Sequence, residues 1–145
     1  MNETFEFFMP MKKVPTATHQ QKSTKVVRGK NPKNDKVVYF NPPNVVDAIR
    51  LFNKSLLPHV PEKMIEAKAI RLTTYWLYGT KQKKNFGKLK ITRPDTDNSI
   101  KLLKDEMSKL KFWKDDALVA IDQIHKYWAD EDKSGIFVRI EVIEQ

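Results

Sequence analysis

The stretch AKAIRLTTYWLY, residues 67–78, predicts the strand on which the fold is built. It carries many β-branched and aromatic residues, which are enriched in strands, and it is apolar on both faces, as a strand at the centre of a sheet is. Gly79 ends the run. The rings of Tyr75 and Trp76 could stack on nucleic-acid bases, but burial inside the sheet is the interpretation that we favour.

Four further stretches have the composition of strands. They are Thr4–Met9, closed by Pro10; Val37–Phe40, closed by Pro42 and Pro43; Val119–Trp128; and Ile136–Ile143. In the last of these, apolar residues alternate along one face, which is the period-2 pattern of a strand with one buried side. A polar turn at residues 130–135 separates the last two stretches, so we expect them to form an antiparallel hairpin.

Two stretches have apolar residues at helical spacing. These residues are Val45, Ile49, Phe52 and Leu56 in the first stretch, and Ile100, Leu103, Met107 and Leu110 in the second. We expect Asn44 to cap the first helix, Pro58 to follow its end, and Asp97 to cap the second helix. The apolar residues of both helices are predicted to lie in the core, and we assign them no functional role.

Helices and strands are therefore mixed along a chain of 145 residues, a length typical of one domain. We predict an α/β (α+β) fold in which a small mixed sheet of four to five strands carries two main helices. The single domain is expected to span residues 1–145. A hydrophobic fraction of 40% is enough for one core.

The charge of the chain favours an anionic partner. Lys and Arg number 27 against 18 Asp and Glu, a formal net charge of +9. Such an excess favours nucleic acid, although it says nothing about the fold. The segment Lys12–Lys36 holds eight basic residues and one acid, and Lys81–Lys90 holds five lysines and no acid. We interpret the first as a basic loop or arm and the second as an exposed loop or hairpin that approaches phosphates; the alternative for both is a solvated, solubilising segment.

Several classes of protein are excluded by composition. The chain has no cysteine, which excludes disulfides and thiolate metal sites. Its three histidines are scattered without the spacing of zinc ligands. No window approaches the roughly 18 apolar residues of a membrane span, and the acidic start of the chain differs from a secretory signal. We expect a soluble cytoplasmic protein with no membrane partner.

Carboxylates gather at two points of this basic chain. Asp95 and Asp97 precede the second predicted helix, and Asp115 and Asp116 follow it. Lys101 lies four residues after Asp97 and projects from the same helical face. If the strand after Asp116 returns alongside the helix, three carboxylates converge into an oxygen-rich site suited to Mg²⁺ or Mn²⁺. Such a site beside a lysine and a basic surface has the parts needed for metal-assisted phosphodiester hydrolysis.

These acids have two other interpretations. Asp97 could simply cap the helix while Asp115 and Asp116 occupy a turn, and this reading stays open. A calcium-binding loop starting at Asp95 is discarded, because its sixth position requires glycine and Ile100 stands there.

The motif Asp95-x-Asp97-Asn98-x-x-Lys101, followed by Phe112-Trp113-x-Asp115-Asp116-Ala117-x-Val119, resembles the signature of the RusA family of Holliday junction resolvases. The close resemblance covers residues 93–119, and looser agreement extends it to about half of the chain. It implies a small α/β homodimer that binds DNA four-way junctions and uses Mg²⁺ to nick strands symmetrically. The resemblance implies action during DNA recombination and repair. Relatives of this type are common in phages and prophages, which suggests a role in phage recombination or DNA packaging.

The resemblance also implies roles for individual residues. Asp95, Asp97 and Asp116 would be the metal-binding catalytic acids, and Lys101 the catalytic lysine. Candidate nucleic-acid contacts are Lys12, Lys13, Lys84, Lys88, Lys90 and Arg93. A non-catalytic basic DNA-binding module and a metal nuclease acting on other branched DNA remain as alternatives.

Overall fold

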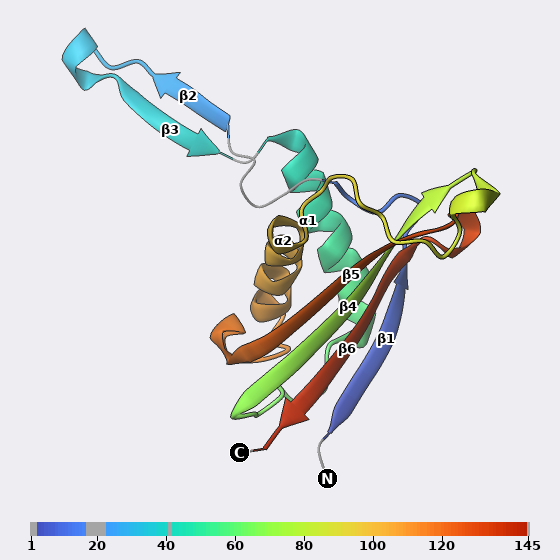
Figure 1. The fold of residues 1–145 in the computed structure, drawn as a ribbon. Helices are drawn as coiled ribbons and strands as arrows, with labels where there is room; N and C mark the ends of the chain where they lie inside the picture. The colour runs from blue at the N-terminus through green and yellow to red at the C-terminus, as the bar shows by residue number, and fades with distance from the viewer. Residues whose placement is uncertain (1–2, 17–22, 41, 145) are drawn as a thin grey trace.

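The computed structural model describes residues 3–16, 23–40 and 42–144. Its strands are β1 (Thr4–Pro10), β2 (Ser23–Val27), β3 (Lys36–Phe40), β4 (Ala69–Thr80), β5 (Val119–Asp130) and β6 (Gly135–Ile143), and its helices are α1 (Pro43–Leu56) and α2 (Thr96–Lys109). Four strands form a mixed sheet in the order β1-β6-β4-β5, and both helices pack on one face of it (Figure 1). The predicted α+β class, with two helices and a small mixed sheet, is confirmed.

The neighbours of the central strand differ from the prediction. β4 pairs in parallel with β5 and antiparallel with β6, so it lies between the two strands that we expected to form a hairpin. The short turn Glu131–Lys133 carries the chain across the end of β4. Gly79 leaves room for this crossing, because a Cβ there would lie 3.1 Å from Glu131 Cα. The hairpin prediction was wrong because alternation identifies a strand's buried face and not its neighbour.

Side chains at every second position of β4 face the helices. Ile70, Leu72 and Trp76 are buried there, and the ring of Phe52 from α1 meets Trp76 edge-on with 6.0 Å between ring centroids. The Trp76 indole donates a hydrogen bond to Thr74 Oγ1 at 2.9 Å, so its one polar group is satisfied within the sheet. The expected burial of Trp76 is therefore confirmed, and base stacking by this ring is excluded.

Both helices begin earlier than expected. Pro42 precedes α1 and Pro43 is its first residue, so Asn44 is already inside the helix. A proline at the first helical position is favoured because its missing N–H would have no partner there. Asp95, and not Asp97, is the cap residue of α2, where Ser99 N donates to the Asp95 carbonyl at 3.1 Å. The side chains of these cap residues make no capping hydrogen bond.

The predicted basic loop at 12–36 contains a strand. β2 pairs antiparallel with β3 in a separate two-stranded sheet, which lies apart from the main sheet in Figure 1. Residues 17–22 of the basic segment lie outside the described residues. Within the part that the structure describes, no helix is long and apolar enough to cross a membrane.

Candidate active site

The predicted acids are carried by the start of α2 and by the turn that precedes β5. Asp95 has extended backbone at the helix cap, while Asp97 already lies in the first turn of the helix. The two side chains therefore leave the chain from different backbone conformations. Asp116 begins the short turn Asp116–Leu118, which leads directly into β5. Asp115 caps this turn, because its Oδ1 accepts a hydrogen bond from Ala117 N at 2.9 Å.

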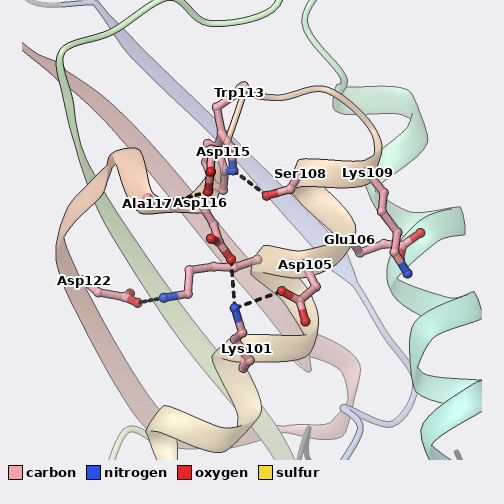
Figure 2. Close-up of polar contacts among 11 residues, drawn as sticks. Lys101, Asp105, Glu106, Ser108, Lys109, Trp113, Asp115, Asp116, Ala117 and Asp122 are labelled. Atoms are coloured by element: carbon pink, nitrogen blue, oxygen red, sulfur yellow. Dashed lines mark hydrogen bonds and ion pairs between the residues drawn. The ribbon is translucent and has the colours of Figure 1, made fainter.

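A buried aromatic pair brings the second acidic group back to the helix. Phe112 and Trp113 follow α2 and are fully buried. Phe112 N donates to the Met107 carbonyl at 3.1 Å, and Trp113 Nε1 donates to Ser108 Oγ at 2.8 Å. Both bonds fasten the turn to the last part of α2, which sends the following residues back along the helix (Figure 2).

Lys101 lies between Asp116 and a further acid on the same helix, Asp105. Its ammonium lies 3.0 Å from Asp116 Oδ2 and 3.1 Å from Asp105 Oδ1 on the next turn of α2 (Figure 2). The hydrogen bond from Lys101 lowers the pKa of the Asp116 carboxyl below its usual range. The hydrogen bond to Asp116, followed by that to Asp105, raises the pKa of Lys101. Asp116 is therefore ionised at neutral pH, and a cation already lies against it.

A further acid, Asp122 on β5, was not predicted from the sequence. It faces the helices, and its Oδ2 accepts a hydrogen bond from Lys104 at 2.8 Å. Its Oδ1 is buried without a hydrogen-bond partner among the described residues. Lys104 stands one turn of α2 from Lys101, so the helix presents two lysines to two acids. The signal in the sequence was a carboxylate that alternation places on the same strand face as Ile124 and Trp128.

The residues fit a hard metal ion by their chemistry. Asp95 and Asp97 are exposed at the start of α2, whose positive end favours negative charge. In the described ranges, no three His, Asp or Glu side chains are grouped closely enough to hold a metal ion. The available donors are all carboxylate oxygens, the ligands that Mg²⁺ and Mn²⁺ prefer. On the neighbouring strand β5, the buried Oδ1 of Asp122 is a further carboxylate oxygen that no described group satisfies.

Most of the predicted phosphate contacts lie on the surface. Lys12, Lys13, Lys84, Lys88 and Arg93 are exposed. Lys90 differs, because its side chain is only 7% exposed and its ammonium donates to Thr92 Oγ1 at 2.7 Å. The expectation that Lys90 meets DNA in an exposed loop was therefore wrong, since its ammonium is directed into the protein.

This is a small basic α+β domain with several carboxylates and a lysine beside one helix, and these are the residue types that a nuclease needs. The chain belongs to the RusA endodeoxyribonuclease family, because the family model described as Endodeoxyribonuclease RusA matches residues 9–141. It is also 31% identical over 137 residues to the crossover junction endodeoxyribonuclease rusA of Lactococcus phage r1t. That alignment covers 94% of this chain and 96% of the phage protein. The resemblance seen in the sequence is confirmed.

Proposed function

We propose that this protein is a divalent-metal-dependent endonuclease that resolves DNA four-way junctions by symmetric nicking. Family membership supports cleavage of DNA, and the name of the phage relative supports a crossover junction as the substrate. The structural observation that carries the proposal is the contact between Lys101 and Asp116 at 3.0 Å beside the start of α2. It brings an acid and a lysine from two separate motifs together.

Asp95, Asp97 and Asp116 are the residues that would hold Mg²⁺ or Mn²⁺. A metal ion bound there supplies a nucleophilic water of lowered pKa and neutralises charge on the phosphate. The lowered pKa of Asp116 keeps its carboxylate ionised and able to act as a ligand at neutral pH. The exposure of Asp95 and Asp97 lets their side chains turn toward a ligand without disturbing the core.

Lys101 supplies the positive charge at the scissile phosphate. Its ammonium has two acidic partners, Asp116 and Asp105, at nearly equal distances. When the Asp116 carboxylate is engaged elsewhere, Asp105 keeps the ammonium beside the site. A cation held there stabilises the negative charge that develops on the phosphate oxygens in the transition state.

The basic surface orients the DNA. Exposed Lys12, Lys13, Lys84, Lys88 and Arg93 offer contacts to the phosphate backbone. Such contacts fix orientation and carry no base information, so selectivity rests on the shape of the junction. Two symmetric nicks need two sites, which a homodimer supplies through its two-fold axis.

The test is cleavage of an end-labelled synthetic four-way junction in Mg²⁺, with linear duplex of the same sequence as a second substrate. We compare the wild type with Asp95→Asn and Lys101→Ala. Asp47→Asn, which changes an exposed aspartate on α1, is the matched control. The expected result is paired symmetric nicks in the junction from wild type and control alone, with the duplex intact.

Three other results contradict the proposal. Tight junction binding without cleavage in Mg²⁺ or Mn²⁺ identifies a binding module. Equal cleavage of flaps and splayed duplexes, added as third and fourth substrates, identifies a broader branched-DNA nuclease. Asp95→Asn with full activity removes this residue from the metal site.

A further inference from the structure

The segment that leads into Asp95 is fastened to the outer edge of β5. Lys90 N donates to the Lys126 carbonyl at 2.8 Å, and Trp128 N donates to the Lys88 carbonyl at 2.9 Å. After Lys90 this pairing stops, and residues 91–94 cross to the start of α2 without belonging to a strand or helix. The position of Asp95 therefore depends on what holds these four residues.

The buried side chain of Lys90 binds the segment of residues 91–94. Its ammonium donates to Thr92 Oγ1 at 2.7 Å, to the Thr92 carbonyl at 3.3 Å and to the Arg93 carbonyl. A lysine has three protons to donate, so these acceptors use its full capacity. The ammonium also lies 4.9 Å from the ring centroids of both Tyr78 and Trp128, which favours the charged form.

Lys126 holds the same segment from the side of β5. Its ammonium donates to the Thr92 carbonyl at 2.6 Å and to the Pro94 carbonyl at 2.7 Å. Together with Lys90, it covers three consecutive carbonyls immediately before Asp95. Charge-assisted bonds of this kind are roughly twice as strong as neutral ones, so the pair replaces the missing strand partner.

We propose that Lys90 and Lys126 are positioning residues that set the backbone entering α2 and thereby place Asp95 for metal binding. This inference rests on the proposed function, because Asp95 is taken as a metal ligand. Burial and the charge of Lys126 lower the pKa of Lys90, so holding two ammonium groups here has a cost. The hydrogen bonds to the carbonyls of residues 92–94 offset this cost. Two lysines are needed to reach all three carbonyls, because either lysine alone would leave one of them without its donor.

A direct contact with DNA explains these lysines less well. All three donors of Lys90 face protein acceptors, and its side chain is almost fully buried. Lys126 is half-buried, and its ammonium donates hydrogen bonds to two carbonyls. A phosphate at the Lys90 ammonium would have to displace bonds that hold the proposed site, and one at Lys126 would find a single remaining donor.

The test compares Lys126→Met and Lys90→Met with the wild type, and uses Lys63→Met, at an exposed lysine before β4, as the control. Methionine keeps the length and apolar character of the lysine stem while removing the ammonium. The first readout is Mn²⁺ affinity by calorimetry on the protein without DNA. Loss of groups that orient metal ligands weakens metal affinity by about 10- to 100-fold, and we expect a loss in this range.

Two further readouts separate positioning from a general loss of structure. Junction cleavage is expected to lose kcat while KM and the Kd for the junction stay within twofold of wild type. Amide exchange of residues 91–99 is expected to rise, with the central strand β4 unchanged. Lys126→Arg, which keeps the charge and at least two donors, should retain most of the Mn²⁺ affinity.

Each outcome either supports or overturns the positioning role of Lys90 and Lys126. Unchanged Mn²⁺ affinity and amide exchange in Lys126→Met would overturn the proposal, and so would weaker junction binding with metal affinity intact. If Lys90→Met fails to fold, Lys126→Met still gives the answer, because its side chain is only half-buried. A wild type that cuts no DNA defeats the proposed function alone, since amide exchange still tests the two lysines.

Discussion

Replacing Lys101 by methionine should change metal binding and cleavage in opposite directions. In the structure its ammonium lies 3.0 Å from Asp116 Oδ2, where a metal ion would have to bind. The metal-free protein thus contains a competitor for its own site. Removing that competitor should strengthen binding of Mn²⁺ to the free protein, although the same change removes the cation needed at the phosphate.

The size of the first effect follows from the exposure of the pair. The Lys101 side chain is 40% exposed and that of Asp116 25%, so water screens much of their attraction. Exposed ion pairs contribute about 0.2–1 kcal/mol, and the upper end of this range corresponds to about fivefold in an equilibrium constant. We therefore expect Lys101→Met to raise Mn²⁺ affinity by up to about fivefold. Loss of a donor to a transition-state oxyanion costs about 10²–10³ in kcat, and cleavage should fall by that factor.

Calorimetric titration with Mn²⁺ and single-turnover cleavage of the junction give the two quantities. Lys109→Met is the matched control, because this lysine lies on the same helix, is 68% exposed and stands 3.8 Å from Glu106. It should behave as wild type in both assays. A fall in Mn²⁺ affinity for Lys101→Met would refute the reasoning, since it would show that the lysine organises the acids and does not compete for them.

Three other perturbations have expected outcomes. Gly135→Ala should lower the free energy of unfolding by about 3 kcal/mol in urea titration, because a Cβ there would overlap the Met9 carbonyl where β1 meets β6; an unchanged stability would show that this edge yields easily. In metal-free buffer, the stability that wild type holds over Asp116→Asn should be present above the ordinary carboxyl pKa of 3.8 and should decline as pH falls below it, because Lys101 lowers the folded pKa; a difference that does not decline below pH 3.8 would contradict this. Lys88→Gln should reduce the salt slope of junction binding by about 1, measured by titration at several salt concentrations, and an unchanged slope would remove Lys88 from the phosphate contacts.

The sequence predicted best those helices and strands whose apolar residues repeat with the period of the element. β4 was found because its residues are buried on both faces, and α2 because Ile100, Leu103 and Met107 repeat along one buried stripe. The order of the strands was not accessible in this way. Whether β5 pairs with β6 or with β4 depends on the crossing at Gly79, which is a close approach between distant segments.

The sequence predicted the candidate site only in part, because only some of its contacts are local in the chain. The spacing from Asp97 to Lys101 is local and follows from helical geometry, so it could be read from the chain. The contact between Asp116 and Lys101 depends on the burial of Phe112 and Trp113 in the turn between them. The sequence showed that these two residues are aromatic, but it did not show the path of the turn. Lys90 was misread because a lysine within a lysine-rich run has the same local signature whether its ammonium meets water or backbone carbonyls.

The pairing of β1 with β6 has a consequence for the order in which the protein is made. β1 pairs only with β6 among the described strands, from Thr4 opposite Glu141 to Pro10 opposite Gly135. β1 therefore has no strand partner during synthesis until β6 has been made. Sequence-distant pairing of this kind slows folding and leaves an open edge in the meantime. The four-stranded sheet is therefore complete only after synthesis has passed residue 143.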